Sequence, residues 1–411
     1  MKSLLFMTSL VLLFGIGNLM SSKYSTIEIP IFKLEINLKP KIDPELEKEI
    51  REVISKSEKT QKRKIFSANQ LFNQARLYTV SLHAFYKKTD LGPDEDPSLL
   101  SKKEGGYRCY GIVISTHYIL TDGHCVEDLA KKQEVEIWAH FSKTHNRVLR
   151  KAVEVVGYTS FKSTTMDIAL LKFKDVNFAA KVFAPLGKSD KTKTGEDIIV
   201  IGGPYSINEF LTSGKIGKKT APPYYLGPEL LATEAKIFPG NSGGPILNLK
   251  GEVLGLCDFG WPYHPIINIE QIHFFTGIDD VKIILPRLLK GGEIELSDFP
   301  YGIKDSESLS MPHLKEMGLD SINAEGPVVL QKKSAIPMIS SLNEIFEWLI
   351  TGDIIKRYDG KIVKTVSDIA KINLLYEPGK EVEVQILRKG KFLLKKIKLI
   401  NVKTTLKSSD D

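Results

Sequence analysis

The chain has 411 residues, about the length of two or three domains. Its hydrophobic fraction of 42% and charged fraction of 26% exclude a disordered chain, a collagen-like fibre and a polytopic membrane protein. The net charge of +7 is mild for a nucleic-acid binder, and three cysteines are too few for a disulfide scaffold or a four-thiolate zinc site.

The N-terminus has the pattern of an export signal. Lys2 precedes residues 4–16, which are almost entirely apolar. The longer stretch 4–20 has 17 residues, which is marginal for crossing about 30 Å of hydrocarbon. Residues 1–22 are therefore predicted to be a cleaved signal peptide or a membrane anchor, with a buried helix as the remaining alternative. Either main interpretation predicts an extracytoplasmic protein, periplasmic or secreted, with a possible membrane tether.

Residues 23–74 are predicted to form a linker and a short helix. Pro30 and Pro40 favour an extended chain up to residue 42. Asp43-Pro44 is typical of a helix start. Apolar residues then recur at helical spacing: Leu46, Ile50, Val53 and Ile54. The charged run 56–64 favours a solvated end to this helix over a membrane-surface patch.

Residues 75–290 have the pattern of an all-β domain, a barrel or a sandwich. Short β-rich runs recur between turn residues: Tyr78–Phe85, Gly111–Leu120, Glu134–His140, Ala152–Val156, Ile168–Phe173, Ile198–Ile201 and Gly251–Leu256. The polar segment Leu91–Gly106 is predicted to be a surface loop. A brief helix is expected near Leu285–Lys290, and Gly291-Gly292 is a predicted boundary.

Residues 295–400 are predicted to form a small sheet with two helices, followed by a polar tail, 401–411. Asp359-Gly360 is a tight-turn dipeptide between two apolar runs. Helices are expected near Leu314–Gly318 and over Ser367–Leu375, and Val382–Ile386 alternates as a strand. The basic final strand is better explained by a hairpin with one solvated face than by lipid or nucleic-acid binding.

The sharpest chemical signal is the run Gly240-Asn241-Ser242-Gly243-Gly244-Pro245. A serine hydroxyl is a weak nucleophile unless a base removes its proton and backbone donors stabilise the oxyanion. A glycine two residues before the serine lets the backbone turn its N–H inward. The motif favours a nucleophilic Ser242, and a glycine-rich structural turn is the alternative.

A histidine and a carboxylate in matching positions are expected to activate this serine. His124 follows an apolar run in the frame Thr121-Asp122-Gly123-His124-Cys125, where Gly123 leaves room for close packing. Asp167 lies at the mouth of the apolar strand 168–173, where a buried carboxylate can orient an imidazole.

The order His124, Asp167, Ser242 and the surrounding frames resemble the chymotrypsin-fold serine proteases, whose triad is a standard template. The closer resemblance is to the HtrA/Deg branch, extracytoplasmic proteases with a C-terminal PDZ domain. It includes Thr194-Gly195-Glu196-Asp197 leading to Ile201-Gly202-Gly203-Pro204, and the run from Pro239 to Gly255. The resemblance implies a mainly β fold: a two-barrel protease domain over 75–290 and an α+β PDZ domain over 295–400.

The resemblance also implies roles for individual residues. Ser242 would attack a peptide carbonyl, His124 would move the proton, and Asp167 would orient His124. The oxyanion hole is expected at Gly240, Asn241 and Ser242, with Asn241 contributing backbone geometry. Substrate-strand pairing is expected at four consecutive residues: Cys257, Asp258, Phe259 and Gly260. The mechanism needs no cofactor, metal or nucleotide, and the partners would be polypeptides, not nucleic acid.

Tyr301-Gly302-Ile303 is similar to the carboxylate-binding loop of the family's PDZ domains. Such modules bind an extended chain end by adding it to a sheet edge. The resemblance implies that peptide C-termini bind here, with an occluded groove as the alternative. The family also tends towards homotrimers, for which residues 65–85 are the expected contact.

Two departures from the family pattern leave alternatives open. Asp122-Gly123 stands where the family usually has Asn-Ala, and Cys109-Tyr110 stands where it has Gly-Ser. The spacing of Cys109 and Cys125 resembles the histidine-loop disulfide of animal-type chymotrypsin proteases, with two buried thiols as the alternative. The main hypothesis is an exported endopeptidase of unfolded proteins. A catalytically silent peptide-binding member and a processing protease with one substrate are the alternatives.

Overall fold

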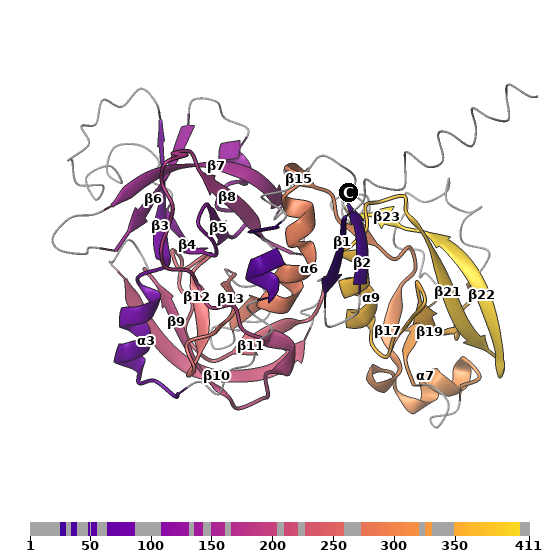
Figure 1. Cartoon of the computed structure of the whole chain (residues 1–411). Helices are drawn as coiled ribbons and strands as arrows, with labels where there is room; N and C mark the ends of the chain where they lie inside the picture. The colour runs from indigo at the N-terminus through magenta and orange to yellow at the C-terminus, as the bar shows by residue number, and fades with distance from the viewer. Residues whose placement is uncertain are drawn as a thin grey trace, which may run out of the picture. The chain divides into compact units, whose positions relative to one another are not determined.

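We describe the chain from a computed structural model. The structure describes residues 25–29, 34–38, 48–49, 51–55, 64–86, 108–130, 135–142, 149–160, 166–203, 209–220, 227–258, 273–319, 325–330 and 349–402. The chain divides into two units, Met1–Lys56 and Ser57–Asp411. Figure 1 traces the elements from indigo at the N-terminus to yellow at the C-terminus.

The first unit contains a β-hairpin where the sequence predicted a linker. Strand β1 (Ser25–Ile29) pairs antiparallel with β2 (Leu34–Leu38). The apolar residues alternate with a period of two, which suits pairing strands better than an unpaired chain. Residues 48–49 and 51–55 are helical, within the expected short helix. The predicted signal or anchor, 1–22, lies outside the described residues, and no helix among those described is long and apolar enough to cross a membrane.

The second unit begins with a closed β-structure. Its sheet has the order β15-β7-β6-β3-β4-β5-β8, and an additional pairing of β7 with β8 closes six of these strands. The strands are β3 (Thr79–Tyr86), β4 (Arg108–Val113), β5 (Tyr118–Thr121), β6 (Val135–Phe141), β7 (Arg150–Thr159), β8 (Ala169–Phe173) and β15 (Gly292–Ile294). The predicted single strand Gly111–Leu120 is wrong. The chain reverses within it, where Ile114 N–H donates to Tyr118 O, and forms β4 and β5.

A second closed barrel follows, with the order β10-β11-β14-β13-β12-β9. Its strands are β9 (Asp197–Gly202), β10 (Phe210–Thr220), β11 (Leu230–Thr233), β12 (Pro245–Asn248), β13 (Val253–Cys257) and β14 (His273–Gly277). Strand β13 is buried along its whole length, as expected for a short apolar run at the centre of a barrel. The two barrels confirm the mainly β, chymotrypsin-like fold class (Figure 1).

Short helices pack beside the barrels. Helix α3 (Ala68–Ala75) begins with a capping box, in which the Ser67 hydroxyl accepts from Gln70 N–H and the Gln70 amide accepts from Ser67 N–H. Helix α5 (Glu127–Ala130) follows the histidine segment. Helix α6 (Ile278–Leu288) is completely buried and starts seven residues earlier than the expected helix. A 3-10 turn, η2 (Ser189–Lys191), precedes the second barrel.

Among residues 295–319, 325–330 and 349–402, the C-terminal part is a small sheet with two α-helices, at the places where the sequence predicted them. Its sheet has the order β17-β18-β19-β21-β22 with β20 beside β19. The elements are β16 (Ser297–Asp298), β17 (Ile303–Asp305), η4 (Ser306–Ser308), α7 (Met311–Glu316), β18 (Pro327–Val329), β19 (Ile354–Tyr358), β20 (Lys361–Ile362), α9 (Val366–Asn373), β21 (Glu381–Arg388), β22 (Lys391–Lys398) and β23 (Ile400–Asn401). The predicted turn Asp359-Gly360 has φ values of 48° and 74°, the left-handed region that such turns require.

Helix α9 contacts the barrel region through charged side chains. Lys371 Nζ lies 2.6 Å from Asp190 Oδ1 and 3.2 Å from Asp280 Oδ1. Burial lowers the pKa of Lys371, but the two carboxylates outweigh it and raise this pKa. Arg287 on α6 also donates to the carbonyl of Leu374, 2.9 Å away. The C-terminal sheet is therefore joined to the barrels by buried ionic and hydrogen-bonded contacts.

Candidate active site

The histidine segment wraps tightly around Asp167. His124 N–H donates to Asp167 Oδ1 at 2.7 Å, directly after strand β5 ends at Thr121. A Cβ on Gly123 would lie 2.2 Å from Thr159 O and 2.9 Å from Asp167 Oδ1. Only glycine fits between these atoms, so the space expected beside His124 is filled by the backbone of a neighbouring strand.

Asp167 and His124 form a buried pair. His124 Nδ1 lies 2.5 Å from Asp167 Oδ2, and the two side chains are 17% and 5% exposed. Burial lowers the pKa of the His124 imidazole, but the charge and hydrogen bond of Asp167 outweigh this effect and raise the pKa overall. Thr159 holds the segment before strand β8, because its hydroxyl accepts from Ile168 N–H at 3.0 Å. Asp167 thus holds the imidazole of His124 in a defined orientation through its Nδ1 atom.

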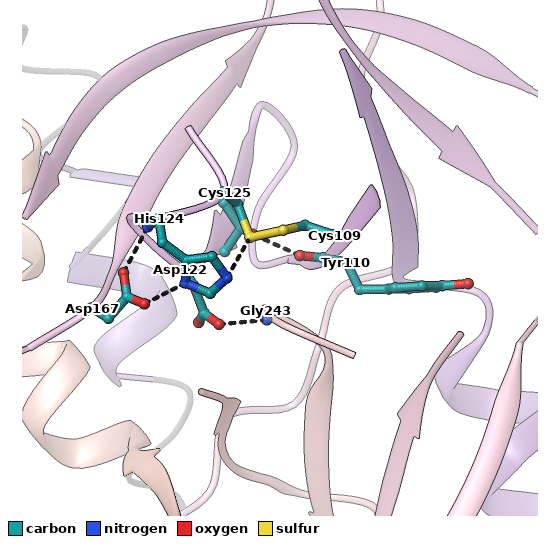
Figure 2. The surroundings of a disulfide bond; sticks show 8 residues. Cys109, Tyr110, Asp122, His124, Cys125, Asp167 and Gly243 are labelled. Atoms are coloured by element: carbon teal, nitrogen blue, oxygen red, sulfur yellow. Dashed lines mark hydrogen bonds and ion pairs between the residues drawn. A yellow bond between two sulfur atoms is a disulfide. The ribbon is translucent and has the colours of Figure 1, made fainter. Parts of the chain in front are cut away.

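Ser242 lies on the glycine-rich turn between strands β11 and β12. Gly243 has a φ of +76°, and a Cβ there would lie 2.1 Å from Tyr110 O. Tyr110 N–H donates to Ser242 O at 2.7 Å, which attaches this turn to strand β4. The His124 Nε2 lies 3.8 Å from Cys125 Sγ (Figure 2).

The residues expected at the oxyanion hole differ in backbone conformation and in the hydrogen bonding of their N–H groups. Gly240 has a φ of +96°, a conformation that favours glycine. Asn241 N–H donates to Phe238 O at 2.9 Å, so this donor is engaged within the turn. In the part of the chain that the structure describes, no hydrogen bond engages the N–H groups of Gly240 and Ser242. The geometry agrees with Gly240 and Ser242 as donors and with a backbone role for Asn241.

Two further carboxyl groups surround the pair, and the sequence did not assign them to it. Asp122 is completely buried, and its Oδ2 accepts from Gly243 N–H at 2.8 Å. One ligand atom from each of Asp122, His124, Asp167 and Asp258 lies within 4.8 Å of the others. Burial, followed by the charge of Asp167, raises the pKa of both Asp122 and Asp258 well above the ordinary aspartate value. The adjacency of Asp122 to the His124 frame was the only sequence signal for this cluster.

The expected substrate-pairing segment lies only partly in the described chain. Cys257 N–H donates to Gly244 O, and Cys257 O accepts from Gly243 N–H, both at 2.8 Å. The prediction that Cys257 pairs with substrate is therefore wrong, because its backbone groups bond within the barrel. Burial, with the nearby charges of Asp122 and Asp258, raises the pKa of its thiol. Phe259 and Gly260 lie outside the described residues.

Cys109 and Cys125 are joined by a disulfide, with Cα atoms 6.0 Å apart (Figure 2). The bond attaches the histidine segment to strand β4, on the side of the imidazole opposite Asp167 in Figure 2. Cys109, His124 and Cys125 are close enough to hold a metal ion, but the disulfide leaves no thiolate to bind one. In the cluster of Asp122, His124, Asp167 and Asp258, the imidazole and Asp167 already hold each other.

The expected carboxylate-binding loop, Tyr301-Gly302-Ile303, leads into strand β17. Gly302 O accepts from Leu330 N–H at 2.8 Å, and a Cβ on Gly302 would meet nothing within 4 Å. Asp305 Oδ1 accepts from Val366 N–H at 2.7 Å, which connects the end of β17 to the start of helix α9. The loop thus lies beside β17, which ends the strand order of its sheet, and helix α9 is connected to that strand.

A family model described as a trypsin-like peptidase domain matches residues 109–256. The chain is 30% identical over 297 residues to the serine protease Do-like HtrA of Bacillus subtilis, covering 69% of this chain and 60% of that protein. It is 26% identical over 288 residues to a probable periplasmic serine endoprotease DegP-like of Halomonas elongata, covering 68% and 53%. The chain thus spans less than two thirds of the length of these relatives.

The fold resembles solved structures of HtrA-type proteases. The structure titled HtrA-type protease AlgW with tripeptide has a TM-score of 0.57 at 19% identity, and the match covers 82% of this chain and 97% of that one. The AlgW structure with a decapeptide has a TM-score of 0.53 at 18% identity. At these identities the likeness shows the fold alone, and the family follows from the sequence matches.

Proposed function

With residues 109–256 forming a trypsin-like peptidase domain in an HtrA-type chain, we propose that this protein is a serine endopeptidase that cleaves polypeptides through His124, Asp167 and Ser242. The observation that carries the proposal is the double contact of His124 with Asp167, at 2.7 Å and 2.5 Å. A carboxylate that receives both the backbone N–H and the ring nitrogen holds the imidazole in the tautomer that a general base needs.

In the proposed reaction, His124 accepts the proton of Ser242 while the hydroxyl oxygen attacks the substrate carbonyl. The resulting imidazolium is stabilised by Asp167, which remains ionised. His124 then gives the proton to the leaving amine, and water repeats the sequence to release the acyl group. The N–H groups of Gly240 and Ser242 stabilise the oxyanion, and one such donor contributes about 3 kcal/mol.

A fluorophosphonate probe tests this proposal directly, because it labels only an activated serine. The purified chain should be labelled, and the Ser242→Ala variant should not. Casein hydrolysis by the same two proteins provides the matching activity assay. If parent and variant are labelled equally, Ser242 is not the nucleophile. If neither is labelled across pH 5–9 with unfolded protein present, the endopeptidase proposal fails.

A second candidate function is a catalytically silent, peptide-binding member of the same fold. It is favoured by the buried position of Ser242, which is 4% exposed. Active-site geometry often tightens only in the complex with substrate, so a buried serine also suits a resting enzyme. Probe labelling after addition of unfolded protein separates the two.

For the remaining features, we infer export, on the N-terminal pattern and the periplasmic relatives, and action on unfolded or damaged proteins. A dedicated processing protease is the alternative for the substrate, and proteomics of cleaved termini separates the two. The loop Tyr301-Gly302-Ile303 beside edge strand β17 supports a PDZ module that binds peptide C-termini. A homotrimer through residues 65–85 remains a proposal that sedimentation would test.

A further inference from the structure

A buried carboxyl group connects the segment that carries the imidazole to the turn that carries the hydroxyl. Asp122 lies two residues before His124, and its Oδ2 accepts from the N–H of Gly243, the residue after Ser242 (Figure 2). These two segments are 121 residues apart and belong to different barrels. The Gly243 N–H is shared, because it also donates to Cys257 O at 2.8 Å. Asp122 therefore adds a side-chain contact that helps to set the distance between the two reacting side chains.

Backbone contacts alone leave this junction incomplete. Tyr110 N–H donates to Ser242 O at 2.7 Å, and Tyr110 O accepts from the Thr121 hydroxyl at 2.6 Å. These contacts attach the turn to strand β4, which the Cys109–Cys125 disulfide joins in turn to the histidine segment. Asp122 adds a direct side-chain contact from the histidine segment to the nucleophile turn.

The surroundings of Asp122 favour its neutral form. Asp167 and Asp258 lie in the same cluster, together with His124, and the buried thiol of Cys257 is nearby. Burial first, then the charges of Asp167 and Asp258, raise the pKa of Asp122, and the Gly243 N–H opposes them only in part. As a neutral acid, Asp122 still offers a carbonyl oxygen to that N–H.

We propose that Asp122 is a positioning residue of the endopeptidase proposed above, whose carboxyl oxygen holds the Ser242 turn against the histidine segment. The inference rests on the proposed function. An amide at position 122 presents the same acceptor oxygen, so the acceptor rather than the charge does the positioning. Ionisation of Asp122 as the pH rises would place another negative charge beside Asp167, disturb the pair with His124 and favour the protonated imidazole, which cannot act as a base.

The test compares Asp122→Asn with Asp122→Ala by the rate of fluorophosphonate labelling and by kcat and KM on a peptide substrate. Asp122→Asn should be labelled at close to the parent rate and keep its activity to higher pH. Asp122→Ala should lose about 100-fold in labelling rate and kcat with little change in KM, because a shift of about 1 Å between reacting groups has that effect. Asp175→Asn, which removes an acid paired with Lys151 elsewhere in the same barrel, is the matched control and should behave as the parent.

Hydrogen exchange at the peptide containing Gly243 reads the same contact in a protein of any activity. Exchange should be faster in Asp122→Ala than in Asp122→Asn. If Asp122→Ala does not fold, Asp122→Leu fills the volume without an acceptor and takes its place. Parent-like labelling and exchange in the variant without an acceptor would overturn the proposal, as would an equal loss in Asp122→Asn. A parent that stays unlabelled in the presence of unfolded protein refutes the endopeptidase instead, and the exchange comparison then still decides whether Asp122 holds the turn.

Discussion

Replacing Gly123 by alanine tests how the histidine segment is positioned. The added Cβ would lie 2.2 Å from Thr159 O, about 0.8 Å closer than real Cβ atoms approach backbone, and 2.9 Å from Asp167 Oδ1. Neither neighbour can move freely, since Thr159 belongs to strand β7 and Asp167 receives two hydrogen bonds from His124. The segment itself must therefore move by nearly 1 Å.

A displacement of that size between catalytic groups is expected to lower kcat/KM about 100-fold, which corresponds to about 2.7 kcal/mol of barrier. Overpacking should also reduce the free energy of unfolding by about 1–3 kcal/mol. The assays are the fluorophosphonate labelling rate, kcat/KM on a peptide substrate and urea denaturation. Gly217→Ala is the control, because the same methyl on strand β10 meets Ala232 Cβ at 3.2 Å, where small adjustments suffice.

The outcome that refutes this reasoning is a Gly123→Ala protein labelled at the parent rate. It would mean that the imidazole keeps its place although its segment has moved. Equal losses of activity in Gly123→Ala and Gly217→Ala would also refute it, because the effect would then be general overpacking rather than a local displacement.

Three other perturbations address charge and covalent structure. Asp122→Asn should raise the free energy of unfolding, and this gain should grow above about pH 4 by up to 1.36 kcal/mol per pH unit. The reason is that the raised pKa of Asp122 makes the folded state hold a proton that the unfolded state has lost. Equal gains in urea titrations at pH 5 and pH 8 would contradict this. Cys125→Ser opens the loop that the disulfide closes and should lower the free energy of unfolding by about 3 kcal/mol. The parent protein in dithiothreitol should show the same loss of stability. No change in either protein would mean that the disulfide does not form. Lys371→Met leaves the buried Asp280 without its cation, whereas Asp190 keeps Lys219 at 2.8 Å, and it should destabilise the chain by about 3 kcal/mol. Lys396→Met, at an exposed pair, should change stability by less than about 1 kcal/mol. Equal effects of the two lysine variants would refute the buried connection.

Local signals explain what could be predicted. The turn at Ser242 needs glycines because its backbone contacts other strands. The turn at Asp359-Gly360 needs left-handed φ values. Both requirements are visible in a few consecutive residues. The capping box of Ser67 and Gln70 is equally local, although helix α3 was not predicted. The period-two pattern of residues 25–38 also contained the β1–β2 hairpin that was taken for a linker.

Errors arose where a role depends on distant partners. Cys257 was expected to pair with substrate, but Gly243 and Gly244 occupy its backbone groups across the barrel. Strands β11 and β14 were not predicted because a short run buried on both faces has no distinctive period. Nothing in the local sequence indicates that Asp258 lies beside Asp122.

By itself, the sequence determined the nucleophile turn, the order of His124, Asp167 and Ser242, and the succession of a β-rich part and a small mixed part. Each depends on residue types that a backbone conformation or a reaction requires within a few positions. Only the tertiary structure decided that Asp122 links two barrels and that three carboxyl groups surround one imidazole. Burial and Coulomb interactions depend on distances in space, which closure of the barrels sets between residues more than 100 positions apart.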